Sequence, residues 1–149
     1  MPKLNHEIFF IPVLTSINKI KKTLLYISYE QFLQNDILFD STLRRLQVIG
    51  ESVKNLLTVN LLKENQYWKK IVLLANLETN EPFDPDPEII FRVASDHVQE
   101  IEKNVLHFIN KIPDKKYLRY AFSDTKEVLS KMKHYDEVAY LDEIEKNLA

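Results

Sequence analysis

The 149-residue chain has very little of what several classes of protein require. It contains a single glycine, Gly50, whereas all-β domains use many glycines in turns with positive φ. One glycine also excludes the glycine-rich loops that bind dinucleotides or triphosphates. The chain has no cysteine, which excludes disulfides, thiolate metal sites and a cysteine nucleophile. These absences favour an all-α protein.

Long hydrophobic runs and a strong excess of one charge are absent as well. No run approaches the ~20 apolar residues of a membrane span, and the first 14 residues lack the pattern of a signal peptide. The formal net charge is −2, so a broadly basic surface for nucleic acid is not expected, although a local basic patch is compatible with it. We therefore expect a cytoplasmic globular chain with no membrane segment, no cofactor and no metal.

Hydrophobic residues recur every three or four positions, which is the period of an amphipathic helix. This pattern predicts helices over residues 7–27, 40–62, 68–77 and 87–112, and two further amphipathic segments between 113 and 149. Ser28 and Gln31 have the spacing of a capping box, which predicts a short helix after residue 28. Gly50 lies inside the helix over 40–62, where a glycine costs roughly 1 kcal/mol relative to alanine. The close approach of a neighbouring helix is the expected reason for it.

The stretch QFLQNDILFDSTLRRLQVIGESVKNLL, residues 31–57, resembles the HepT-like branch of the HEPN superfamily. The first predicted helix, Trp68 and the helix that opens with PEIIFRV lie where that family would place them. The similarity covers about residues 7–112, which we take as the HEPN-like helical domain. Residues 113–149 are then a C-terminal helical extension packed on the same domain. The resemblance implies an all-α up-and-down bundle of HEPN type, in a family of helical toxins encoded beside small nucleotidyltransferases.

Active members of that family carry an Arg-Asn pair, then a histidine, then a tyrosine that receives AMP from the partner enzyme. The resemblance places these four positions at Ala75, Asn76, Asn80 and Pro82. RNA cleavage needs a group that moves protons and a cation that stabilises the charged phosphorane. Alanine does neither, and asparagine cannot act as an acid or base near neutral pH. Only Asn76 is retained, so the motif is degenerate and no intact catalytic set remains.

Arg92 and His97 reproduce the spacing of the family's arginine and histidine at another place. On a continuous α-helix, residues five apart differ in direction by about 140°, since each residue turns about 100°. Arg92 then belongs to the polar face, while His97 falls on the apolar stripe between Ala94 and Ile101. This pattern favours a core or interface histidine. The alternative is a catalytic pair in an active, metal-independent RNA endonuclease.

Basic residues on the helix over 40–62 are candidates for binding. Arg44, Arg45 and Lys54 could face a phosphate backbone. The alternative, which we favour, is a solvated helix face, or an ion pair with Asp40 or Glu51.

The segment from residue 78 to residue 86 is acidic and rich in proline. We expect it to contact protein rather than RNA, because its charge repels phosphates and its prolines lower the entropy cost of binding. Phe83 is either an anchor in a partner's pocket or a residue that folds onto its own core.

Together these observations predict a catalytically degenerate HepT-like protein that acts by binding a macromolecular partner. That partner is another HEPN chain, in a homodimer or a heterodimer, or a nucleotidyltransferase, in a toxin–antitoxin or defence setting. RNA binding is expected to be weak. Two alternatives stay open: an active ribonuclease that uses Arg92 and His97, and a helical scaffold of unrelated function.

Overall fold

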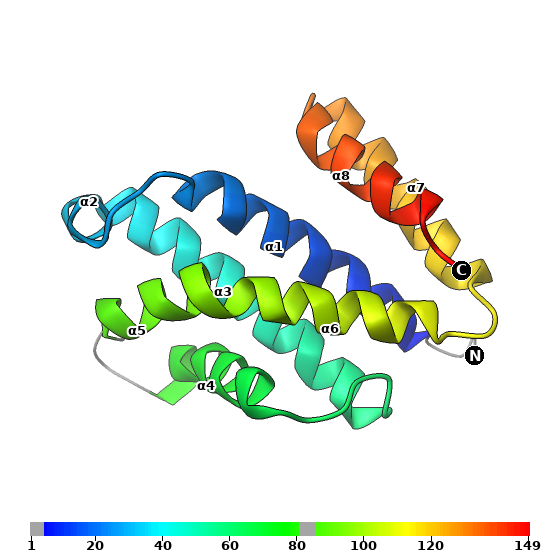
Figure 1. Cartoon of the computed structure of the whole chain (residues 1–149), viewed down its shortest axis with the longest axis horizontal. Coiled ribbons are helices and arrows are strands. Elements are labelled where there is room, and N and C mark those ends of the chain that lie inside the picture. Colours follow the sequence, from blue (N-terminus) through cyan, green and yellow to red (C-terminus); the bar gives the residue numbers. More distant parts are fainter. Residues whose placement is uncertain (1–4, 81–85) are drawn as a thin grey trace.

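The computed structural model describes residues 5–80 and 86–149, without the side chains of residues 74–80. Every regular element in these ranges is helical (Figure 1), so the predicted all-α fold is confirmed. None of these helices is long and apolar enough to cross a membrane. In chain order the elements are the 3-10 turn η1 (His6–Phe9), α1 (Phe10–Leu24), α2 (Tyr29–Gln34), α3 (Asp36–Thr58), α4 (Gln66–Asn80), α5 (Pro87–Arg92), the π turn η2 (Val93–His97), α6 (Val98–Asn110), α7 (Lys116–Lys131) and α8 (Tyr135–Lys146).

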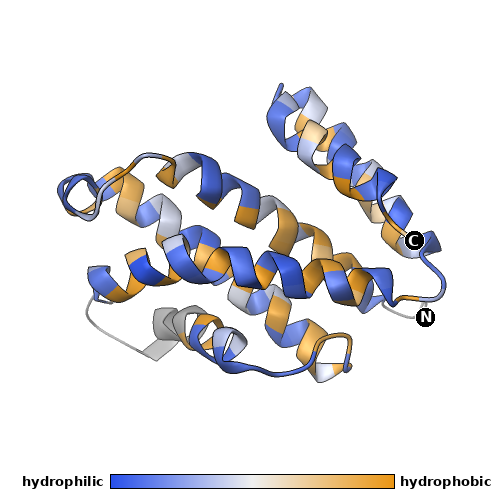
Figure 2. Cartoon of the chain, viewed as in Figure 1, coloured by the Kyte–Doolittle hydropathy of each residue, from blue (hydrophilic) through white to orange (hydrophobic). Residues whose placement is uncertain are grey.

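Helix α3 is the centre of the bundle and packs along both α1 and α4 (Figure 1). Hydrophobic and hydrophilic positions alternate along the helices (Figure 2), as expected when each helix buries one face. On α3 the buried face includes Leu46, Ile49 and Val53, which join one hydrophobic cluster with Trp68 of α4. Gly50 lies on the same helix and is also buried. Its burial within the chain agrees with the close helix approach predicted for it.

The sequence located the helices better than it located their ends. The capping box is confirmed: Ser28 Oγ accepts from the Gln31 N–H at 3.1 Å, and the Ser28 N–H donates to Gln31 Oε1 at 2.9 Å. Helix α3 begins at Asp36 rather than at residue 40. The earlier start follows from Asn35, whose Oδ1 accepts from the Leu38 N–H at 3.0 Å and so caps the helix.

The last helix of the HEPN-like region is not continuous. It begins at Pro87 as predicted, capped by Asp86, but the π turn Val93–His97 interrupts it. In a π turn each hydrogen bond reaches five residues back instead of four, so the helix is locally wider than an α-helix. The angle of about 140° expected between Arg92 and His97 assumed an uninterrupted α-helix, which the π turn replaces here. Arg92 is exposed and His97 is half-buried, as the predicted polar face and apolar stripe require.

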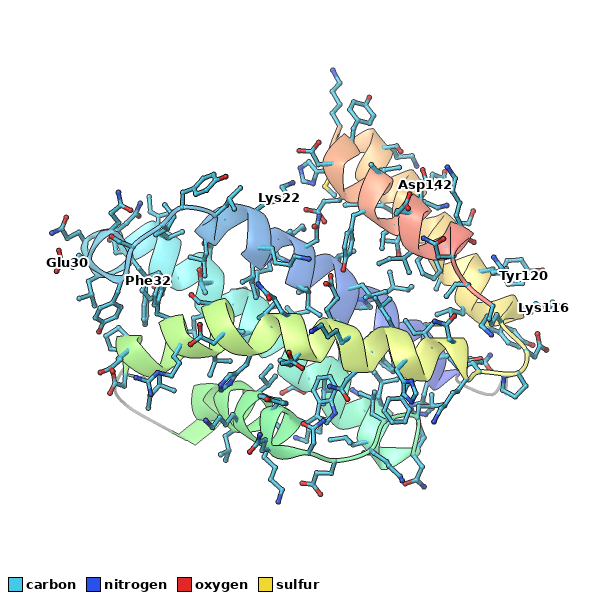
Figure 3. All side chains as sticks on the ribbon, viewed as in Figure 1. Lys22, Glu30, Phe32, Lys116, Tyr120 and Asp142 are labelled. Atoms are coloured by element: carbon cyan, nitrogen blue, oxygen red, sulfur yellow. The ribbon has the colours of Figure 1, made fainter. Side chains whose placement is uncertain are left out.

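Helices α7 and α8 form a C-terminal hairpin that packs against η1 and α1 (Figure 1). The hairpin contacts α1 through a buried carboxylate, that of Glu137 of α8, which is 1 % exposed. Asn18 Nδ2 donates to Glu137 Oε2 at 3.0 Å, and Lys22 Nζ donates to Glu137 Oε1 at 3.1 Å. Figure 3 shows Lys22 on the side of α1 that faces the hairpin. A buried carboxylate satisfied by two groups of α1 thus fixes the position of α8.

Candidate functional site

Helix α4 carries three of the four positions of the degenerate motif. Ala75, Asn76 and Asn80 lie in the C-terminal half of α4, although their side chains are not described. Pro82 and Phe83 fall within residues 81–85, outside the described residues. The predicted degeneracy therefore rests on residue identity alone, and both it and the role predicted for Phe83 stay predictions.

His97 is half-buried against an aromatic ring. The imidazole meets the ring of Tyr67 edge-on, with 5.1 Å between centroids and 66° between planes. Its Nδ1 atom is buried and has no hydrogen-bond partner among the described residues. His97 therefore packs against a side chain of α4, as expected of a core or interface histidine.

Arg92 is engaged elsewhere. Its Nη2 atom donates to Glu88 Oε1 at 3.0 Å, and both side chains are exposed. A pocket of about 210 Å³ opens beside Arg92 and is lined also by Asp96 and Phe91, but not by His97. The pocket beside Arg92 therefore does not bring the two side chains together. The described part of the chain holds no group of three His, Asp or Glu side chains that could bind a metal.

We expect His97 to titrate below the usual range of histidine. Burial lowers the pKa of His97, the positive charge of Lys70 lowers it further, and Asp96 only partly opposes these effects. An NMR titration of the imidazole protons should give a midpoint below about 6.5, the value of an unperturbed histidine. The variant His97→Gln identifies the signal by removing it.

The same shift has a consequence for stability. The pKa of His97 is lower in the folded chain than in the unfolded chain, where it is about 6.5. The free energy of unfolding therefore decreases as the pH falls from about 6.5 through the pKa of the folded chain. If the NMR titration of His97 gave a midpoint at or above that of a free histidine, it would contradict the burial described for this ring.

The basic residues of α3 do not form one surface. Arg44 is exposed, Arg45 is half-buried, and Lys54 lies about 14 Å further along the helix axis, at 1.5 Å per residue. Lys54 lines a separate pocket, together with Lys63. Neither arginine forms an ion pair with Asp40 or Glu51 in the described part of the chain, so of the two forms of the favoured alternative only the solvated face remains for the exposed Arg44.

Arg45 instead lines a cleft of about 500 Å³ between α1, α3 and the turn from α7 to α8. Its lining is mostly polar and charged, with cations from all three segments. Arg45 was predicted from the sequence as a binding residue. The other cations of the cleft were not predicted, because they come from segments that lie far from Arg45 in the chain. The lining residues are Lys19, Ile20, Lys22, Thr23, Ser41, Thr42, Arg45, Lys133, His134, Tyr135, Asp136 and Glu137.

Comparison with known proteins identifies the class to which this bundle belongs. The family model described as "HepT-like: Ribonuclease HepT-like" matches residues 13–108. A protein of Methanocaldococcus jannaschii named "Putative RNase MJ1380" is 27 % identical over 108 residues, which are 70 % of this chain and 97 % of that protein. No solved structure matches the chain significantly.

A second relative agrees with the first. The protein named "Putative RNase TTE0752", of Caldanaerobacter subterraneus subsp. tengcongensis, is 31 % identical over 86 residues, which are 57 % of this chain and 77 % of that protein. The chain belongs to the HepT-like family, and the resemblance drawn from residues 31–57 is confirmed.

The family match ends at residue 108, near the end of α6, so helices α7 and α8 lie outside it. The aligned 108 residues make up 97 % of the Methanocaldococcus jannaschii protein but only 70 % of this chain, so that protein is the shorter of the two. The cleft beside Arg45 is therefore built only in part by the family region, because five of its lining residues come from the hairpin.

Proposed function

We propose that this chain is a catalytically degenerate HepT-like protein that binds a second HepT-like chain, most directly a second copy of itself, in a toxin–antitoxin or defence setting. The observation that carries the proposal is the presence of Ala75 and Asn80 where the family places its arginine and histidine. A chain without the proton-transfer group and the cation of the family's reaction has to act through what it binds.

The surface of α4 supports this proposal. Leu73 lies just before the motif positions and is 64 % exposed. Beside it is a groove of about 330 Å³, lined by Leu57, Val72 and Trp68. An exposed aliphatic side chain next to an apolar groove suits the packing of a helix from another chain. The resemblance to the family implies that active members place this motif at a dimer cleft, so the partner is expected on this side of α4. Gly50 adds no support, since it is already buried within the chain.

The test is the oligomeric state of a variant in this groove. We expect light scattering across micromolar concentrations to give a dimer for the wild type and a monomer for Leu73→Asp. A charge in a desolvated interface costs at least about 1.4 kcal/mol, which weakens association at least about tenfold. The matched control is Ile37→Asp on α3, at another exposed aliphatic residue that lies outside the groove.

Three outcomes decide the matter. Loss of the dimer in Leu73→Asp but not in Ile37→Asp supports the proposal. A wild type that is monomeric at every concentration excludes the homodimer, and co-purification with a nucleotidyltransferase would then identify the other predicted partner. A dimer that both variants retain would place the interface away from α4.

A further inference from the structure

The cleft between α1, α3 and the α7–α8 turn holds more positive charge than its acidic residues neutralise. Its two acids are already engaged, because Lys22 Nζ lies 3.1 Å from Glu137 Oε1 and 3.7 Å from Asp136 Oδ2. Glu137 is also bound by Asn18. The remaining cations are Lys19, Arg45 and Lys133, one from each of the three segments, and none has an ion pair in the described residues. Three cations thus line one cleft without acidic partners.

The closeness of these cations raises the electrostatic energy of the cleft. Burial lowers the pKa of Lys19, and the positive charge of Arg45 lowers it further, ahead of the opposing effect of Glu137. Like charges held together in a partly desolvated cleft repel each other more strongly than they would in water. An anion placed among them relieves this repulsion and gains charge-assisted hydrogen bonds.

Thr42 is an independent indication of a ligand. It is 1 % exposed and lines the cleft, and its Oγ1 atom has no hydrogen-bond partner among the described residues. A buried hydroxyl that makes no hydrogen bond loses the bonds it would make to water in the unfolded chain. The neighbouring Ser41 does bond its hydroxyl, to the Leu38 carbonyl at 3.2 Å. The free hydroxyl of Thr42 therefore calls for a polar partner from outside the chain.

The hairpin turn adds an aromatic ring and fixes the cations on the rim. Tyr135 lines the cleft and is 61 % exposed, so its face is open to a nucleobase. The turn is held by two hydrogen bonds, from the Lys133 N–H to the Ser130 carbonyl at 3.0 Å and from the His134 N–H to the Leu129 carbonyl at 2.9 Å. Cations beside a stacking surface are the combination that recognises a phosphate joined to a base.

We propose that this cleft binds the phosphate monoester of a nucleotide, either free or at the 5′ end of an RNA. Arg45, Lys19 and Lys133 surround the phosphate, the hydroxyl of Thr42 donates to one of its oxygens, and Tyr135 stacks on the base. A phosphate monoester carries close to two negative charges at neutral pH, which matches three cations better than a backbone phosphodiester does. The site depends on the hairpin, and it requires neither the dimer nor the α4 groove.

The experiment measures binding to the full chain by calorimetry at low salt, with AMP as the first probe. We expect AMP to bind, inorganic phosphate to compete, and the affinity to fall as salt rises. Arg45→Gln and Lys133→Gln should each weaken AMP binding about tenfold or more, as expected for a hydrogen bond between charged groups. Thr42→Val removes only the hydroxyl and should weaken binding severalfold while the fold is retained.

Arg44→Gln is the matched control, because Arg44 adjoins Arg45 in sequence but lies outside the cleft. It should bind AMP as the wild type does. To learn whether the phosphate belongs to a free nucleotide or to an RNA end, we compare the binding of two RNAs of the same sequence, one with a 5′-phosphate and one with a 5′-hydroxyl. Preference for the 5′-phosphorylated RNA over AMP identifies an RNA end, and binding of AMP alone identifies a free nucleotide. Absence of binding to AMP and to the 5′-phosphorylated RNA overturns the proposal. Equal losses in Arg44→Gln and Arg45→Gln overturn it too.

Discussion

Purified protein will leave single-stranded RNA and tRNA intact, with a cleavage rate at least about 1,000-fold below that of an active HepT-like relative assayed alongside. The reason lies in Ala75 and Asn80. Removing a general acid or base costs about 10²–10⁴ in rate, and removing a group that stabilises the transition-state charge costs a further 10²–10³. The measurement is the appearance of RNA fragments over time on a denaturing gel, with the protein at micromolar concentration and a chelator present.

The variant His97→Ala makes this result decisive. Cleavage by the wild type that disappears in His97→Ala, with the helical circular dichroism unchanged, would show that Arg92 and His97 form a relocated catalytic pair. The structure argues against this outcome, because Arg92 is bound to Glu88 and His97 packs on Tyr67. Cleavage that persists in His97→Ala would instead locate the activity at residues other than this pair.

Glu137→Ala should lower the free energy of unfolding by about 2–4 kcal/mol, which is near the cost of breaking a buried ion pair. The variant leaves Asn18 Nδ2 and Lys22 Nζ without their acceptor and opens a cavity where α8 meets α1. The effect is smaller than for a fully buried pair, because the side chain of Lys22 is 46 % exposed and regains water. Urea denaturation monitored by circular dichroism measures this change in the free energy of unfolding.

Glu127→Ala is the control for this measurement. Glu127 lies on α7, is 70 % exposed and pairs only with the exposed Lys131 at 3.6 Å. A surface pair of this kind is worth at most about 1 kcal/mol, so the control should remain close to the wild type. Similar losses in Glu127→Ala and Glu137→Ala would mean that the bonds to α1 do not hold the hairpin in place.

The helices were predictable because each leaves a local signal. The buried residues of α3 recur at helical spacing, and Ser28 with Gln31 forms the capping box that its sequence predicts. The π turn Val93–His97 was missed because a search for helical periodicity assumes one period throughout. Its two flanks carry ordinary amphipathic stripes, so nothing in the local sequence marks the change of period between them.

The candidate sites differ in how far the sequence reveals them. The degenerate motif could be proposed from the sequence because its four positions fall within eight residues, and it stays a prediction because no described side chain tests it. The cleft was not predictable, because Lys19, Arg45 and Lys133 belong to two helices and a turn that come together only in the folded chain. Each of these residues alone is an ordinary surface cation. A spatial cluster of unpaired charge is a property of the tertiary packing, and spacing along the chain contains no trace of it.

The position of the C-terminal hairpin also bears on which chains this protein can assemble with. Helix α8 covers part of α1, and the partly buried bond from Lys22 to Glu137 holds it there. The family match ends before this hairpin, so the covered part of α1 lies within the family region while its cover lies outside it. We expect the hairpin to bar assembly through this face of α1, because discrimination between partners needs such obstruction as much as it needs attraction.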